Sequence, residues 1–398
     1  MRGLIDNIDT CSPLNIDLGA KMDSAGQKVY RKKLTFVVSY ANEFGGIQTV
    51  NELLLNMLAS SGEYDITLLS VFKGDNPLFL KLDESIAVKY LFDDKSFDVR
   101  INLPRVVIAF RRFFKSMPRQ DLVVVSEPAF SPAMAFAVPF PVPVIYWDHA
   151  SFNHGKRFGL TWLGRRLACR LKNSSIVSIS EKSKCSYLSE IGRSVRVRRI
   201  YNPISWGLSD CEYNANSRKI ITCMRLSREK GCDYLLDIAK TVLPKHPDWS
   251  WDVYGDGPEY ANMAEKIREY SLVGKLNLMG YSSNLKDIIG GYAFYVMTSR
   301  YEGFGLALTE AQSRKLPCVS FDCDSGPREI ISNGESGFLA KCFSVDEISQ
   351  KISILMCDSE LRKRMSESAY ESAKRFSPQK FFHEWKTCID CRINGAKY

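Results

Sequence analysis

Short apolar runs rich in β-branched residues alternate with amphipathic segments along most of the chain. The first run is residues 34–39 (LTFVVS), and a helical pattern follows it at residues 47–61 (IQTVNELLLNMLASS). Further strand candidates in the first half are residues 65–72, 121–127, 142–148 and 174–180. Strands that alternate with helices in this way predict a parallel sheet with helices on both faces.

The second half of the chain repeats this plan. Its strand candidates are residues 219–226, 249–255, 276–280, 293–299 and 316–322, and residues 308–315 (LTEAQSRK) form a predicted helix between the last two. The final amphipathic segment follows Pro378 and has no strand partner left in the second half. We therefore expect it to be a terminal helix that packs back on the first half.

The pattern predicts an α/β protein of two doubly wound, Rossmann-like domains that face each other across a crevice. The expected boundaries are an N-terminal extension at 1–33, a first domain at 34–200, a linker at 201–218, a second domain at 219–376 and a crossover helix at 377–398. The linker is rich in Asn, Ser and Gly, as turn-forming segments are. Ligands are expected at the carboxyl ends of both sheets.

Composition agrees with two globular domains. The chain has 398 residues, 45% of them hydrophobic, and no apolar run is long enough to span a bilayer. The N-terminal stretch is polar and contains acids, so it does not resemble a signal peptide. The cysteines have irregular spacings, and nothing completes a zinc site around Cys388 and Cys391. A reduced, cytoplasmic compartment is the expectation.

Positive charge is concentrated in the first half. Residues 1–200 hold 28 Lys and Arg against 19 Asp and Glu, whereas residues 201–398 hold 26 of each kind. Such an imbalance indicates an acidic partner. A nucleic acid is disfavoured, because the chain has no base-stacking aromatic motif and no recognised binding module.

Two basic segments make an anionic membrane the expected partner. Residues 104–119 hold five cations and no acid, with Phe110, Phe113 and Phe114 among them, and residues 156–172 hold six cations and no acid. A basic amphipathic helix can lie in a membrane interface with its apolar face in the acyl boundary. The alternative is that both helices cover the first sheet and leave their cations in water.

The stretch SRYEGFGLALTEA, residues 299–311, carries the clearest candidate chemistry. Seven residues separate Glu302 from Glu310, and Gly305 precedes a run of good helix formers. Because a helix N-terminus presents free N–H groups and partial positive charge, this turn can face a diphosphate or a polar sugar. Glu302 is expected to point into the crevice, and Glu310 could reach a vicinal diol such as that of a ribose. The alternative is two solvated carboxylates.

This stretch resembles the Glu-x7-Glu signature of the retaining glycosyltransferases of family 4, which have the GT-B fold. Four other stretches resemble motifs of that family in the right order: EFGGIQ (43–48), MRLSREKG (224–231), VYGDGPE (253–259) and FDCDSGPREIISNGESGFL (321–339). The resemblance is diffuse over residues 1–200 and dense over residues 219–340. One departure is Met224, where the family usually has glycine.

The resemblance implies a role for each matching residue of the donor site. Glu302 would contact hydroxyls of the transferred sugar, and Glu310 would hold the ribose. Arg225 and Lys230 would stabilise the leaving diphosphate without a metal ion. The turn that would hold the diphosphate or sugar consists of Gly303, Phe304, Gly305 and Leu306.

Four further candidates come from the first domain and the linker. His149, in YWDHASF, lies just past a predicted strand end, and the resemblance implies contacts with the donor sugar and the acceptor. Gly45 and Gly46 would let the backbone approach a ligand closely. Asn202 is a candidate polar contact beside the linker. The alternative for His149 is a loop histidine with structural partners. The alternative for the two glycines is an ordinary turn before a helix.

The expected function is that of a hexosyltransferase, and the family resemblance implies that it retains the anomeric configuration. It would move a hexose from a nucleotide-sugar, with UDP favoured over GDP-mannose by the SGPREII loop, to a hydroxyl of a lipid-linked saccharide in bacterial surface polysaccharide synthesis. No cofactor or metal is expected, since Asp322 and Asp324 fall in the donor loop and the family uses no divalent ion there. The expected location is the cytoplasm, peripherally associated with the inner face of the plasma membrane.

Other functions remain open at this point. A sugar-nucleotide epimerase with the same fold is one alternative, whereas a glycan phosphorylase would need a much longer chain. A non-catalytic subunit that binds a partner glycosyltransferase is another, but such a subunit is expected to have lost Glu302, Arg225 or Lys230. All three are present.

Overall fold

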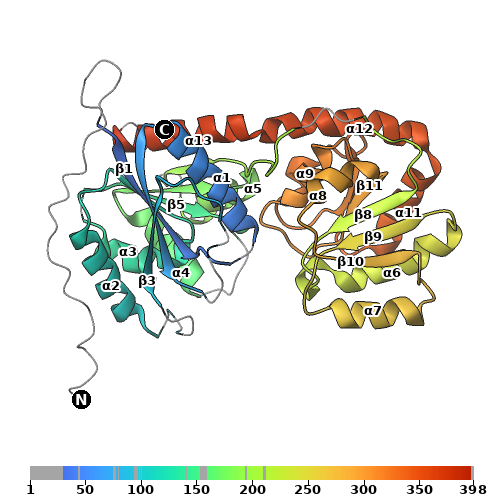
Figure 1. The fold of residues 1–398 in the computed structure, drawn as a ribbon, viewed down its shortest axis with the longest axis horizontal. Helices are drawn as coiled ribbons and strands as arrows, with labels where there is room; N and C mark the ends of the chain where they lie inside the picture. The colour runs from blue at the N-terminus through green and yellow to red at the C-terminus, as the bar shows by residue number, and fades with distance from the viewer. Residues whose placement is uncertain are drawn as a thin grey trace.

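The protein folds into two lobes, each built on a parallel sheet, and a long helical segment runs across both of them (Figure 1). The computed structural model describes residues 30–43, 45–74, 78, 80–93, 97, 99, 101–139, 141–152, 159–192, 195–208 and 212–395. Most of the predicted N-terminal extension, residues 1–29, lies outside these described residues.

The first domain contains a seven-stranded sheet in the order β3-β2-β1-β4-β5-β6-β7. Its strands are β1 Lys32–Tyr40, β2 Tyr64–Phe72, β3 Ala87–Phe92, β4 Leu122–Val125, β5 Val144–Asp148, β6 Ser174–Ser178 and β7 Val197–Arg199, all paired in parallel. The sequence pattern predicted the five inner strands. It missed the two edge strands, neither of which carries a fully buried residue: in β3 Lys89 interrupts the apolar residues, and β7 has only three residues, two of them arginines.

Helices cover both faces of this sheet. They are α1 Gly46–Ser60, α2 Leu103–Ser116, α3 Ser131–Ala137, α4 Leu160–Arg170 and α5 Glu181–Glu190. Side chains of α1 belong to one buried cluster, whereas side chains of α2, α3, α4 and α5 belong to a second cluster. The two clusters are the cores on the two sides of a doubly wound sheet.

The second domain has a six-stranded sheet in the order β10-β9-β8-β11-β12-β13. Its strands are β8 Lys219–Cys223, β9 Ser250–Tyr254, β10 Leu276–Gly280, β11 Phe294–Met297, β12 Cys318–Phe321 and β13 Gly337–Ala340. Its helices are α6 Cys232–Val242, α7 Tyr260–Glu269, α8 Leu285–Ile288, α9 Leu306–Gln312, α10 Pro327–Ile330, α11 Val345–Cys357 and α12 Ser359–Ala373. The strand order reverses between β8 and β11, as it does between β1 and β4, which are the places where such sheets bind ligands.

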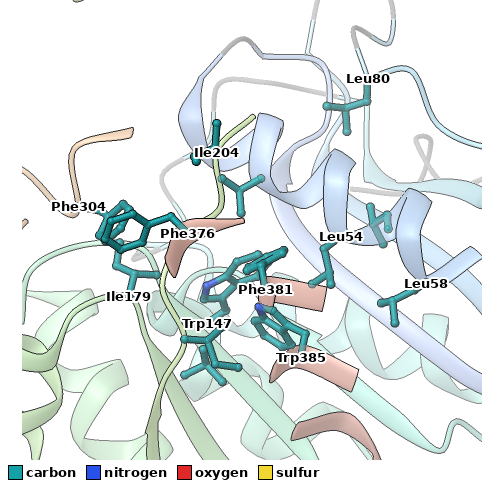
Figure 2. Close-up of a cluster of buried hydrophobic side chains, with 14 of the residues drawn as sticks. Leu54, Leu58, Leu80, Trp147, Ile179, Ile204, Phe304, Phe376, Phe381 and Trp385 are labelled. Atoms are coloured by element: carbon teal, nitrogen blue, oxygen red, sulfur yellow. The ribbon is translucent and has the colours of Figure 1, made fainter. Parts of the chain in front are cut away.

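The last helix, α13 (Pro378–Ile393), leaves the second domain and packs on the first, as the sequence predicted (Figure 1). Ser377 begins it, because its hydroxyl accepts a hydrogen bond from the Lys380 N–H and a proline occupies the first turn. Figure 2 shows Phe381 and Trp385 of this helix facing Trp147 of β5, and the Trp147 and Trp385 ring centroids are 4.5 Å apart.

The basic segments cover the first sheet, which corrects part of the membrane expectation. The apolar stripe of α2, formed by Val106, Phe110 and Phe114, is buried in the core, so these phenylalanines do not face outward. Amphipathic helices that cover a sheet turn their apolar stripe inward. Arg165 of α4 is only 3% exposed and is therefore not a surface cation. Residues 156–158 of the second segment lie outside the described residues.

No helix within the described ranges combines the length and the apolarity needed to cross a bilayer.

Candidate donor and acceptor site at the domain interface

The carboxyl ends of the two sheets contact each other through loops that include those after β1, β5 and β11. A Cβ atom added to Gly46, at the start of α1, would lie 3.0 Å from the Leu306 Cδ1 at the start of α9. One added to Gly303 would lie only 2.3 Å from the carbonyl oxygen of His149, which follows β5. Four of the residues predicted from separate motifs are therefore brought together in two pairs, each joining the first domain to the second.

Glu302 is part of a compact polar cluster. Its Oε1 accepts hydrogen bonds from Lys230 Nζ at 2.7 Å and from Ser299 Oγ at 2.6 Å. The side chain of Glu302 is 11% exposed, whereas that of Lys230 is 30% exposed. Among the described residues no group donates to the second carboxylate oxygen, which leaves it available to a sugar hydroxyl.

The turn after Glu302 is held by glycine geometry and by aromatic packing. Gly305 precedes α9 with a φ of 104°, a left-handed conformation that side chains other than glycine rarely adopt. Phe304 is buried, and its ring centroid lies 5.4 Å from that of Phe376 and 5.6 Å from that of Tyr201. These contacts fix the backbone on which the predicted Gly303–Leu306 anion site depends.

Glu310 faces the linker. Its Oε1 accepts a 2.6 Å hydrogen bond from the hydroxyl of Ser205. Burial raises the pKa of Glu310 to about 7, and the hydrogen bond from Ser205 partly opposes this effect. A diol that bonded to this carboxylate would stabilise its charged form, so the position suits a ribose.

Arg225 and Lys230 both lie in the segment between β8 and α6. Lys230 ends the short 3-10 helix Arg228–Lys230. Arg225 is exposed, and its guanidinium has no hydrogen-bond or ion-pair partner within the described parts of the chain. It is thus available to an anionic ligand.

Met224, the departure from the family pattern, is accommodated by packing. Its side chain packs against the apolar cluster of the second domain. Its backbone N–H donates to the carbonyl oxygen of Tyr254 at 3.0 Å. A Cβ atom added to Gly255 would overlap the Met224 carbonyl oxygen. The glycine that allows these two loops to approach closely is therefore Gly255, in the loop after β9, and not residue 224.

His149 lies against an aromatic side chain of the first domain, and its ring nitrogens are unsatisfied within the described part of the chain. Its ring lies 4.2 Å from the Trp147 ring between centroids, and both of its ring nitrogens are buried with no hydrogen-bond partner among the described residues. Burial lowers the pKa of His149 to about 3, so the imidazole is neutral near pH 7. Because unpaired buried polar atoms cost free energy, a ligand that bonded to these nitrogens would be stabilised.

The remaining predicted residues have weaker structural support. Asn202 is 5% exposed, and its Oδ1 has no partner among the described residues. Gly45 has a φ of 172°, an extended conformation open to any residue. A Cβ atom on Gly45 would, however, lie 2.9 Å from the flexible Gln48 Oε1.

Glu127 and Ser205 were not predicted from the sequence as site residues. Glu127 lies just past β4, and its Oε1 accepts a 3.3 Å hydrogen bond from the Ser39 N–H. Burial raises the pKa of Glu127, as expected for a carboxyl group withdrawn from water. A polar residue directly after an apolar strand was the signal that could have identified it. Nothing local distinguishes Ser205 from the other polar residues of the linker.

Comparisons with known proteins find glycosyltransferases similar to this chain. Residues 212–372 match the sequence model of the family described as glycosyl transferases group 1. An uncharacterized glycosyltransferase of Haemophilus influenzae is 25% identical over 356 residues, which are 89% of this chain and 99% of that protein. The amylovoran biosynthesis glycosyltransferase AmsD of Erwinia amylovora is 25% identical over 366 residues, which are 90% of this chain and 99% of that protein.

A solved structure shows the same fold. It is a mutant of S. aureus TarM in complex with Fondaparinux, alpha-GlcNAc-glycerol and UDP, with a TM-score of 0.74 and 14% sequence identity over 90% of this chain and 100% of that chain. The fold is therefore GT-B, as the sequence predicted. The fold, the match to the family model and the similar proteins together support the conclusion that this protein is a glycosyltransferase.

Proposed function

We propose that the protein is a retaining glycosyltransferase of family 4 that moves a hexose from a UDP-sugar to a hydroxyl of a lipid-linked saccharide. The observation that carries the proposal is the Lys230–Glu302 pair at the turn where Gly303 contacts His149. This arrangement places a cation, a carboxylate and a neutral imidazole at the carboxyl ends of both sheets. UDP is favoured because the related TarM structure contains it, and surface polysaccharide is favoured because AmsD is named for amylovoran biosynthesis.

Each group has a proposed role in the transfer. Lys230 and Arg225 stabilise the negative charge that grows on the departing diphosphate, and preorganised cations do this without a metal. Glu302 accepts hydrogen bonds from the transferred sugar through its free carboxylate oxygen. His149, being neutral, can donate one hydrogen bond and accept another, toward the donor sugar and the acceptor. Glu310 holds the ribose.

A ligand screen tests the proposal. The melting temperature should rise with UDP and with at least one UDP-sugar, because a ligand that binds only the folded state stabilises it. GDP and GDP-sugars should produce little or no shift. A protein stabilised by GDP-sugars alone would contradict the UDP assignment, and turnover of a UDP-sugar without any acceptor would favour the epimerase.

Glu310 gives a prediction with a defined pH window. UDP affinity should increase as the pH rises through about 7, because the ribose hydroxyls bond best to the ionised carboxylate. Glu310→Gln should bind UDP more weakly at pH 8 and should lack this increase. The phosphate of UDP also titrates, but it does so equally with both proteins. Calorimetric Kd values of Glu310→Gln therefore show how much of the pH dependence comes from UDP itself. Parallel pH profiles would contradict the ribose role.

The raised pKa of Glu310 also predicts how stability depends on pH. Stability should fall as the pH rises, whereas UDP affinity should increase. The pKa of this carboxyl in the folded protein lies above the ordinary value of 4.5, so the folded state binds more protons than the unfolded state between these values. Stability of the free wild-type protein should therefore fall relative to Glu310→Gln as the pH rises from about 5 to 8. Melting curves of both proteins across this range measure the difference, and a constant difference would contradict the raised pKa.

The membrane is proposed as the place where the acceptor is met. Arg111, Arg112 and Lys115 of α2 are exposed, and they share the first domain with three outward apolar side chains. These are Ile108 on α2, Phe136 on α3 and Leu163 on α4, which are 51, 65 and 50% exposed. The Arg111 Nε donates to the Phe136 carbonyl oxygen at 2.9 Å, so α2 and α3 contribute to one surface.

A flotation experiment tests the membrane proposal. The protein should float with anionic vesicles at low salt and be released at high salt, since each cation near such a surface contributes on the order of 1 kcal/mol. Changing Arg111, Arg112 and Lys115 to glutamate should abolish flotation. The matched control changes Lys245, Lys363 and Arg364, exposed cations of the second domain, to glutamate and should float normally. Equal flotation of both triple variants would contradict this surface.

A further inference from the structure

A buried charge cluster lies directly behind His149. Asp148, the last residue of β5, accepts hydrogen bonds from Arg165 of α4 through both carboxylate oxygens, from Nε at 2.7 Å and from Nη2 at 3.1 Å. The hydroxyl of Tyr187, from α5, donates to the same carboxylate at 2.6 Å. Arg165, Asp148 and Tyr187 are 3, 2 and 0% exposed. Asp148 precedes His149 in the stretch that predicted this part of the site, but Arg165 and Tyr187 belong to none of the motifs.

The same guanidinium also holds the far end of the His149 loop. Arg165 Nη1 donates to the carbonyl oxygen of Phe152 at 2.7 Å, and Nη2 donates to that of Ser151 at 3.0 Å. One side chain therefore bonds to both ends of residues 148–152. A planar guanidinium has five N–H donors in a fixed geometry, and a lysine ammonium cannot reproduce this pattern.

The His149 loop in turn contacts the donor turn. Its His149 carbonyl oxygen is the atom that a Cβ on Gly303 would meet, and the hydroxyl of Ser151 donates to Asp324 Oδ2 at 3.0 Å. Asp324 forms a backbone bridge with Tyr301, the neighbour of Glu302. A shift of residues 148–152 would therefore move the His149 imidazole and also the backbone against which the Gly303 turn packs.

We infer that Arg165, with Asp148 and Tyr187, is a positioning group for sugar transfer, an inference that rests on the proposed function. It touches no substrate and acts by fixing where the His149 ring and the Gly303 turn meet the donor sugar. A buried ion pair is weak support for stability, because removing two charges from water is costly. Its bidentate geometry does specify orientation, and a misplacement of about 1 Å in an active site can cost on the order of 10²-fold in rate.

Turnover measured together with nucleotide affinity separates positioning from general stability. Arg165→Lys should lower kcat by about 10- to 100-fold per folded molecule. Its Kd for UDP should change by less than about twofold, because the proposed nucleotide groups belong to the second domain and the linker. The matched control is Arg362→Lys. Arg362 is similarly buried, at 4% exposure, and donates to the carbonyl oxygens of Met356 in the second domain and Ala215 in the linker. The control should lose melting temperature and keep its kcat per folded molecule.

If Arg165→Lys fails to fold, Tyr187→Phe tests whether this group positions the site for sugar transfer. It keeps the ion pair and removes only the hydroxyl that donates to Asp148, so a several-fold loss of kcat with wild-type UDP affinity is expected. Wild-type kcat in folded Arg165→Lys, or in Tyr187→Phe, would overturn the inference while leaving the proposed function intact. A wild-type protein that binds UDP but transfers no sugar from any UDP-sugar would overturn both.

Discussion

Lys230→Ala should lose on the order of 10²-fold or more in kcat while its affinity for UDP changes much less. Two effects combine in this variant. The departing diphosphate loses a preorganised cation, and Glu302, whose side chain is 11% exposed, loses the ammonium that bonds to it at 2.7 Å. Single-turnover transfer measured with saturating donor separates the chemical step from binding.

The matched control for Lys230 is available in the same short 3-10 helix. Arg228 begins that helix, is exposed and carries the same charge, but the described partners of Glu302 are Lys230 and Ser299 and not Arg228. Arg228→Ala should therefore transfer at nearly the wild-type rate. Arg225→Ala should behave like Lys230→Ala, with slow transfer and retained nucleotide binding. Near-wild-type kcat in Lys230→Ala would remove the leaving-group role.

Deleting the chain from Ser377 onward should cost the first domain a large part of its stability. The deletion removes four buried apolar side chains of α13, namely Phe381, Trp385, Cys388 and Ile389. Each large buried side chain contributes roughly 1.5–3 kcal/mol, and a whole domain is stable by only about 5–15 kcal/mol. The ion pair between Lys32 Nζ and Asp390 Oδ1, at 2.7 Å, would be lost as well. The truncated protein should aggregate or melt far below the full chain.

A point substitution tests the same packing without removing the helix. Trp385→Ala leaves a cavity beside Trp147 and should cost about 3–5 kcal/mol, which lowers the melting temperature by on the order of 10 °C. Gln379→Ala changes an exposed residue of the same helix and should leave the melting temperature unchanged. A truncated protein that melts and turns over like the full chain would show that α13 does not stabilise the first domain.

The fold was largely predictable because its central strands are buried on both faces. Runs such as residues 36–38 (FVV) and 122–125 (LVVV) are apolar throughout, which is typical of parallel strands. Edge strand β7 has only three residues, all half-buried, and offers no such run. The orientation of α2 was misjudged because sequence alone does not say whether an amphipathic stripe meets a sheet or a membrane. Phe110 and Phe114 meet the sheet.

The candidate site was predictable where short motifs carried it. Glu302 and Lys230 come from separate motifs, and the structure joins them in one ion pair. The contact between Ser205 and Glu310 spans 105 positions and depends on the path of the linker, which no local pattern records. Arg165 resembled a surface cation in a basic segment. Only the position of Asp148 at the end of β5 shows that this guanidinium belongs inside the domain.

The most direct test of the whole account is donor-dependent sugar transfer by the purified wild-type protein. A panel of UDP-hexoses and GDP-hexoses would be incubated with lipid-linked saccharides extracted from bacterial membranes, with nucleotide release and the anomeric configuration of the product followed by NMR. We expect acceptor-dependent release of UDP from at least one UDP-hexose, retention of the anomeric configuration, and loss of release in Lys230→Ala. An inverted product, or release confined to GDP-hexoses and unaffected in Lys230→Ala, would contradict it.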